Sequence, residues 1–333
     1  GALFRGGLTM ANKSQDSAAA LRPGSATAGR AVKKPTRGLR QRKESMTAYL
    51  CLIPVFLGLT IISYIPTISV FILSLFDWNG LTQPKFVGFG NFVKIFTNDM
   101  YFSDSVRVTV LYALIAVFWS MLYSLVIALL LNRRVPARAF WRAVFFIPYM
   151  LPAVGVFTAW RWLYEVNYGL LNYGLRLFGL PPQQFVASAD QVLPSLAVIA
   201  VRCSGNLIVI FLAGLQNVPR VYVEAAEIDG ANSWQKFWHI TIPSISPIIF
   251  YNLLMALISN LQVINPDLAM TNGGPENGSM FISYIIYLYA FQKNKIGYGC
   301  AYAAVFFVIV GIATFILFKT SKEQIFGEGR DDG

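Results

Sequence analysis

Six long apolar runs dominate the chain and are separated by short polar stretches. Each run is long enough to cross a hydrocarbon core about 30 Å thick as a helix. The runs are continuous rather than alternating, and lipid cannot satisfy free backbone N–H and C=O groups, so helices are required. The pattern predicts an all-α polytopic membrane protein with about six transmembrane helices. The runs are roughly Tyr49–Phe76, Val108–Leu131, Phe140–Leu163, Val192–Leu215, Ile245–Ile264 and Cys300–Phe318.

Composition supports burial in lipid rather than in water. Hydrophobic residues make up 56% of the chain and charged residues only 13%, whereas soluble domains carry about 25% charged residues. The net charge of +11 resides mostly in residues 1–44, which hold ten Lys/Arg and two acids. No aromatic residues interleave with these basic ones and no nucleic-acid-binding module is visible. We therefore expect the basic residues to lie beside membrane lipid, and we expect no nucleic acid as a partner.

The distribution of Lys and Arg predicts the orientation of the spans. Basic residues favour the cytoplasmic side of a membrane. The loop after the second run contains Arg133, Arg134, Arg138 and Arg142 and no acid, whereas the stretch 164–191 has one Arg and two acids. The first loop is expected inside and the second outside, so both termini are predicted to be cytoplasmic.

The domain organisation follows from the same pattern. Residues 1–45 are expected to form a disordered basic tail, because they contain almost no bulky apolar residues. Residues 1–9 precede Met10, a candidate natural start, and are left out of the fold reasoning. A membrane domain is expected over 46–320, with a polar cytoplasmic loop at 216–244 and a cytoplasmic tail at 321–333. Prolines within the runs are interpreted as kinks or span ends.

The most polar stretch between spans, Glu224–Pro243, reads EAAEIDGANSWQKFWHITIP. Its first residues are good helix formers, and Asp229-Gly230 is typical of a turn. A second helix is expected over 231–240, with Asn232 or Ser233 as its N-cap. Its aromatic residues lie at i, i+3 and i+4 and are expected to tie the loop to the ends of its own spans; they are Trp234, Phe237 and Trp238.

This stretch resembles the EAA loop of permeases in binding-protein-dependent ABC importers. Ile242 stands where that family usually has Leu. Two further motifs, FLAGLQNVP at 211–219 and TNGGP at 271–275, resemble the carbohydrate-uptake branch that contains the maltose-type permease, and the resemblance extends roughly from Tyr49 to Lys319. The residues that match the loop pattern are Glu224, Ala225, Ala226, Gly230, Ile240 and Pro243.

The resemblance implies a type I importer permease in the bacterial inner membrane. It implies four partners: a second homologous permease, two ATP-binding ATPase subunits and a periplasmic solute-binding protein. No nucleophile–base constellation or phosphate-binding G-x-x-x-x-G-K-[ST] motif is present, so we expect a transport subunit without catalytic residues, cofactor or metal. The alternative for the loop is an ordinary interfacial amphipathic segment. The expected ATPase-coupling residues are Glu224, Ala225, Ala226, Asp229, Gly230 and Ala231.

Polar residues within spans are candidates for a translocation pathway. Arg202 lies near the middle of a predicted span, where the family usually has Trp; it either faces the cavity and attracts an anionic sugar, or pairs with the second permease or a backbone carbonyl. The family's transmembrane sugar site aligns here with residues of different type, so the polar residues can alternatively serve only to hold helices together. The candidates are Arg202, Ser204, Asn252, Ser259, Asn260 and Gln262, with Asp267 beyond the end of the fifth run.

The expected substrate is a carbohydrate, most simply an oligosaccharide, including an anionic one such as alginate. A permease for another solute remains an alternative. An ion-coupled secondary transporter would need carboxylates in mid-membrane, and the predicted spans contain none; a purely structural membrane protein would not need the EAA spacing. Outer loops near 86–104, 164–191 and 271–279 are expected to meet the binding protein, with contacts from Asn272, Gly273, Gly274 and Pro275.

Overall fold

A computed structural model describes residues 37–133 and 136–326. The chain forms two units, 1–58 and 59–333, which are described separately. The described part of the first is the helix α1 (Arg37–Leu59), which contains Pro54. Residues 37–45, expected to lack structure, are therefore helical. Their run of Arg, Gln, Lys and Glu favours helix locally. The remainder of the expected N-terminal tail, and residues 327–333, lie outside the described residues.

The second unit is almost entirely helical. Its one sheet is a two-stranded antiparallel hairpin in which Phe76 faces Phe86. In chain order the elements are η1 (Thr60–Tyr64), α2 (Ile65–Leu73), β1 (Phe76–Asp77), β2 (Lys85–Phe86), α3 (Gly90–Asn98), α4 (Phe102–Asn132), α5 (Arg138–Met150), α6 (Ala153–Leu163), α7 (Leu170–Leu177), η2 (Phe185–Ala187), α8 (Ala189–Arg202), α9 (Gly205–Gln216), α10 (Arg220–Ile228), α11 (Ser233–Lys236), η3 (Phe237–Thr241), α12 (Ile242–Ser244), α13 (Ser246–Leu261), η4 (Asp267–Thr271), α14 (Ile282–Tyr287), η5 (Leu288–Gln292) and α15 (Ile296–Phe326).

Three helical stretches are long and apolar enough to span a membrane without a break: Tyr49–Leu73, Phe102–Asn132 and Ile296–Thr320. Three bent helix pairs supply the others. The bends are 95° between α5 and α6, 49° between α8 and α9, and 68° between 233–244 and α13. The expected six spans are therefore present when each bent pair counts as one span, and the all-α prediction is confirmed.

Of the prolines in the spans, Pro152 and Pro247 lie at bends, whereas Pro54, Pro148 and Pro194 lie inside α1, α5 and α8. Pro66 lies in the first turn of α2, directly after the π-helix η1. Pro152 precedes α6 at the sharpest bend, and Pro247 lies in the first turn of α13. Pro152 and Pro247 lose no helical hydrogen bond, since their missing N–H would have had no partner within the helix. Pro66 lies in a continuous helical stretch, so it removes a donor there.

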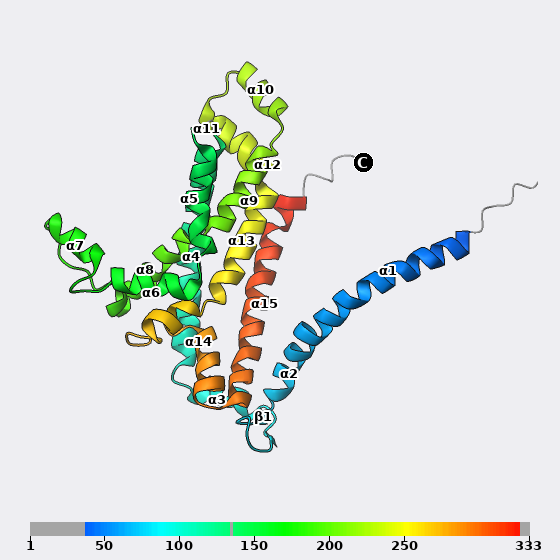
Figure 1. Cartoon of the computed structure of the whole chain (residues 1–333), viewed down its shortest axis with the longest axis vertical. Helices are drawn as coiled ribbons and strands as arrows, with labels where there is room; N and C mark the ends of the chain where they lie inside the picture. The colour runs from blue at the N-terminus through cyan, green and yellow to red at the C-terminus, as the bar shows by residue number, and fades with distance from the viewer. Residues whose placement is uncertain (1–36, 134–135, 327–333) are drawn as a thin grey trace, which may run out of the picture. The chain divides into compact units, whose positions relative to one another are not determined.

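The core of the second unit is built on α4, which contacts α8, α9 and α13; α13 in turn contacts α15 (Figure 1). Buried serines allow close approach of two of these helices: the Ser124 hydroxyl on α4 lies 3.0 Å from that of Ser204, before α9. In Figure 1, α10 and α11 lie at one end of this bundle and α3 lies at the other.

Candidate functional site

The first helix of the 216–244 loop, α10, ends in a glycine turn. Gly230 adopts a left-handed conformation with φ 78°. Its N–H donates to Glu227 O at 3.2 Å, and the Ala231 N–H donates to Ala226 O at 2.9 Å. These two bonds form a Schellman motif, which satisfies the last carbonyls of the helix. The predicted Asp229-Gly230 turn is confirmed, and it fixes the direction in which the chain leaves α10.

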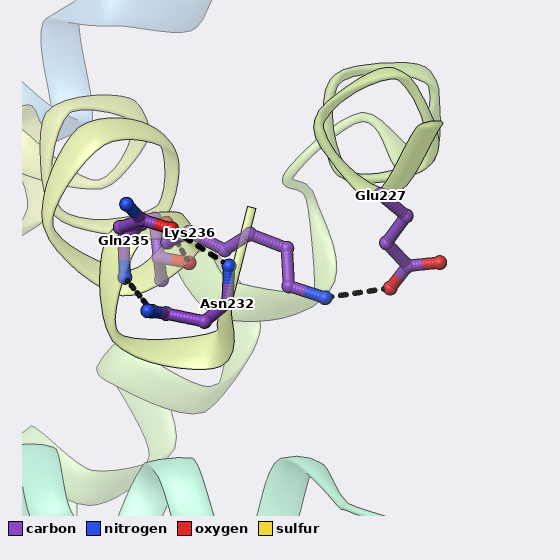
Figure 2. Close-up of polar contacts among 5 residues, drawn as sticks. Glu227, Asn232, Gln235 and Lys236 are labelled. Carbon is purple, nitrogen blue, oxygen red and sulfur yellow. Dashed lines mark hydrogen bonds and ion pairs between the residues drawn. The ribbon is translucent and has the colours of Figure 1, made fainter. Parts of the chain in front are cut away.

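The second helix of the loop begins with a capping box, shown in Figure 2. The Asn232 carboxamide accepts the Gln235 N–H at 2.9 Å, and the Gln235 carboxamide accepts the Asn232 N–H at 2.8 Å. Of the two N-caps predicted, Asn232 is correct. Lys236 Nζ then reaches Glu227 Oε1 at 2.7 Å and joins the two helices (Figure 2). The Asn232 cap and this pair hold the loop in a defined shape.

The residues matched to the EAA pattern lie at the surface of this loop. Glu224, Ala225, Asp229 and Gly230 are exposed, and Ala226 and Ala231 are partly exposed. Beside them, Ile228 has 87% of its surface exposed. A cavity of about 860 Å³ opens between α10 and the η3–α12 segment. Its walls include Ala225, Ala226, Asp229, His239 and Ile240. The loop thus exposes small side chains, the carboxylates of Glu224 and Asp229, and the apolar side chain of Ile228.

The predicted role of the aromatic face is wrong. Trp234, Phe237 and Trp238 pack against one another, with ring centroids 5.2 to 6.0 Å apart. Trp234 remains 68% exposed and Trp238 49% exposed, so the face does not tie the loop to its own spans. Exposed Trp residues of this kind are typical of a membrane–water interface.

At the opposite end of the bundle, a buried carboxylate organises the loop that contains TNGGP. Asp267 Oδ1 accepts the hydroxyls of Thr271 and Ser279, both at 2.9 Å, and its Oδ2 accepts the Phe281 N–H at 3.3 Å. Asp267 is fully buried. Burial raises its pKa to about 7, although these hydrogen bonds act in the opposite direction. Sequence reasoning noted Asp267 only as a polar residue beyond a span, because its bonds depend on how the irregular stretch after it folds back.

This network fixes the four residues expected to meet a binding protein. Asn272 is exposed and has φ 50°, and Gly273 has φ 85°. A side chain at Gly273 would collide with Met280, so glycine is required there by both conformation and space. Gly274 and Pro275 follow, half-buried, and the Gly274 carbonyl accepts the Ser279 hydroxyl at 2.9 Å. The structure brings all four together in one folded loop.

The predicted pathway residues separate into a buried and an exposed group. Ser204 is buried at the α8–α9 break, and Asn252 is fully buried with its Nδ2 donating to Leu207 O at 3.2 Å. Asn260 donates to Ala256 O within its own helix. Ser204 and Asn252 therefore join different helices, as the alternative interpretation of these polar residues has it, whereas the Asn260 bond stays within α13.

Arg202, Ser259 and Gln262 are exposed on the second unit. Ser259 and Gln262 lie on one stripe of α13, together with Tyr251 and Met255, at helical spacing. Arg202 ends α8 and borders a cavity of about 310 Å³ that also touches Trp119. Polar side chains on such an open face are consistent with a second protein or an aqueous path beside it rather than lipid alone.

Metal ligation finds no support in the described part of the chain: there, no three His, Cys, Asp or Glu side chains lie close enough together to hold an ion. His239 instead places its Nδ1 3.0 Å from the Gln235 carbonyl. Its position in the wall of the loop cavity is that of a surface residue.

Comparison with known families decides the identity of the fold. Residues 120–321, which include α9, the 216–244 loop and the Asp267 network, match the model of the binding-protein-dependent transport system inner membrane component. The chain belongs to this family. The predicted resemblance to permeases of binding-protein-dependent importers is thereby confirmed, and the protein is a membrane component of a binding-protein-dependent transport system.

Individual relatives agree with this assignment. The chain is 34% identical to the probable ABC transporter permease protein YesP of Bacillus subtilis, over 87% of this chain and 95% of that protein. It is 33% identical to the multiple sugar-binding transport system permease protein MsmF of Streptococcus mutans, over 78% and 90%. A solved bacterial ABC transporter that imports the acidic polysaccharide alginate has a chain with TM-score 0.74 and 21% identity, covering 85% of this chain and 98% of that one. The type I importer permease fold predicted from the sequence is confirmed by that likeness.

Proposed function

We propose that this chain is the permease subunit of an ATP-driven, binding-protein-dependent importer for carbohydrate. The observation that carries the proposal is the 216–244 loop, which is held by its own turn and cap hydrogen bonds and exposes Glu224, Ala225 and Gly230 of the EAA pattern. Relatives named for sugar and alginate transport support a carbohydrate as the substrate. ATP hydrolysis would be carried out by separate subunits, and a second, homologous permease would complete the path.

The coupling step follows from the chemistry of the loop. Ala225, Ala226 and Ala231 have no bulk, so a partner surface can approach the backbone closely. Neither Glu224 nor Asp229 has an ion-pair partner within the described residues, which leaves both carboxylates available to basic side chains on an ATPase. The Gly230 turn and the Asn232 cap make the loop stiff enough to transmit motion to the adjoining helices. The loop, and with it both termini, would then face the cytoplasm.

At the other end, the loop held by Asp267 would dock the solute-binding protein. Asn272 and Glu276 are its exposed residues, and the buried hydrogen bonds beneath them keep the loop in one conformation before docking. Such pre-organisation reduces the entropy lost on binding.

Uptake into proteoliposomes tests the proposal. The assembled importer, with ATP inside and a sugar-loaded binding protein outside, should accumulate oligosaccharide, and omission of either ATP or the binding protein should abolish uptake. Glu224→Lys should abolish uptake and the stimulation of ATPase activity by the binding protein. Uptake that persisted without ATP and followed an ion gradient would contradict the proposal.

Arg202 supports a preference of the importer for anionic sugars. Its exposed position at a span break supports the view that it meets an anionic sugar as it passes. Arg202→Gln should then slow uptake of uronic oligosaccharides several-fold and leave neutral ones unchanged. Equal rates for both classes in wild type and variant would remove this role and leave Arg202 as a contact for the second permease.

A further inference from the structure

Two arginines meet where α5 begins and α9 ends. Arg138 and Arg142 are one turn apart on α5. With the Gln216 carboxamide oriented to accept, its oxygen lies 2.8 Å from Arg142 Nη2 and 2.9 Å from Arg138 Nη2. Gln216 is the last residue of α9. Two cations thus converge on one neutral acceptor.

The positive charge at this point has no counter-charge in the described residues. Neither arginine takes part in an ion pair there, and the first turn of α5 contains no acid. The Arg138 Nε is buried and lacks a hydrogen-bond partner within the same residues. Like charges held together are unfavourable unless an anion or water offsets them, so the pair is suited to binding an anion.

An apolar cavity of about 330 Å³ lies beside the pair, between α5 and α9. Arg142 and Gln216 border it where α9 ends, and Gly205 borders it where α9 begins. The walls between are apolar and include Phe146, Ile208, Leu212 and Ala213. Because α9 has 12 residues, it is about 18 Å long, slightly more than half of a 30 Å hydrocarbon core. With its Gln216 end at the membrane surface, the cavity would extend inward over a depth that one leaflet occupies.

We propose that Arg138 and Arg142 bind the phosphate of an anionic phospholipid, one acyl chain of which lies in the cavity between α5 and α9. Guanidinium groups match phosphate oxygens in charge and geometry, and basic pockets between membrane helices suit anionic headgroups. The apolar walls select a lipid over a free anion. Gln216 precedes α10 by only four positions, so the lipid would bind α5 to α9 directly beside the 216–244 loop.

Native mass spectrometry of the full chain tests the site. The detergent-solubilised protein is incubated with equal amounts of phosphatidylglycerol and phosphatidylcholine that carry the same acyl chains. Wild type should retain phosphatidylglycerol in preference, and the Arg138→Gln/Arg142→Gln double variant should lose at least about ten-fold of that retention. Arg133→Gln is the matched control: Arg133 is exposed in the same basic loop but does not border the cavity, and its loss should leave retention unchanged.

A second variant separates a lipid from a free anion and guards against misfolding of the first. Ala213→Phe leaves both arginines in place but fills the cavity, so it should reduce retention of phosphatidylglycerol and leave binding of inorganic phosphate unchanged. The proposal is overturned if the double variant retains as much phosphatidylglycerol as wild type, or if Arg133→Gln loses as much, or if Ala213→Phe has no effect. Loss of the second permease from the double variant, with lipid retention unchanged, would assign the pair to a protein interface instead.

Discussion

The two ends of the helical bundle carry loops that treat their carboxylates in opposite ways. The 216–244 loop leaves its carboxylates exposed and is shaped by local bonds, the Gly230 turn and the Asn232 cap. The loop over 267–281 buries its carboxylate, and Asp267 draws in donors from several residues along the chain. An exposed, unpaired acid is available to a partner, whereas a buried and saturated one can only position other residues. The carboxylates of the 216–244 loop are therefore available to contact a partner. The buried carboxylate of the 267–281 loop instead fixes the conformation of the exposed residues around it.

The largest effect should come from removing the buried carboxylate. Asp267→Ala removes the acceptor shared by the Thr271 and Ser279 hydroxyls and the Phe281 N–H, and each lost hydrogen bond costs about 0.5–1.5 kcal/mol. We expect a loss of stability of about 3 kcal/mol and weak binding of the solute-binding protein, measured by thermal unfolding and by a pull-down in detergent. Asp77→Ala is the control, because Asp77 is exposed in β1 and lies outside the loops expected to meet the binding protein. Equal losses of stability and of binding in the two variants would refute the claim that the buried Asp267 carboxylate organises the loop.

The same carboxylate should make stability depend on pH. Its pKa is raised to about 7, against about 3.9 in an unfolded chain. The folded state then holds the proton more tightly, so its contribution to stability is full below about pH 4 and is lost as pH rises toward 7. Between pH 5 and pH 8, wild type should lose on the order of 2 kcal/mol relative to Asp267→Asn.

Thermal unfolding of both proteins across that range checks this. Asp99 should give the opposite dependence of stability on pH. Burial acts to raise the pKa of Asp99, but its hydrogen bonds, led by the one from Tyr289, lower the pKa overall. Wild type should therefore lose stability relative to Asp99→Asn as the pH is lowered. Parallel curves for wild type and Asp267→Asn would mean that the Asp267 environment does not discriminate between the two protonation states.

The Gly230 turn should matter for coupling more than for stability. Gly230→Val forces a β-branched residue into the left-handed region, at a cost of about 1–2 kcal/mol. Uptake and ATPase stimulation should both fall at least several-fold. Gly80→Val provides the comparison, since Gly80 has φ 83° but lies in the hairpin between β1 and β2, outside the loops expected to meet the binding protein. A similar decline of ATPase stimulation in both variants would make the effect one of general strain.

The smallest effect should come from the ion pair that joins the two helices of the loop. Glu227 is more than half exposed, so a double-mutant cycle with Glu227→Gln and Lys236→Met should give a coupling energy of only about 0.2–1 kcal/mol. Transport should be nearly unchanged. A coupling energy well above this range would show that the pair, rather than the turn and the cap, maintains the shape of the loop.

Features that depend on residues close together in the sequence were predicted, and features that depend on how distant or irregular segments fold together were missed. Continuous apolar runs predicted the spans, and local turn chemistry predicted Gly230 and the Asn232 cap, because each depends on neighbouring residues. The exposed aromatic face was misjudged, since helical spacing shows which residues share a face but not what covers it. The Asp267 network was missed because it depends on how the irregular stretch 267–281 folds back on itself. The Arg138–Gln216–Arg142 contact was missed because it joins residues that are brought together only by the packing of α5 and α9.

Photocrosslinking from both ends in intact membranes tests the central claim most directly. A photoreactive residue at Ile228, 87% exposed beside the matched residues, should crosslink to an ATPase subunit, and the same residue at Asn272 should crosslink to the solute-binding protein. The opposite assignment, or no ATPase adduct from Ile228 in an importer that is actively transporting, would contradict the account.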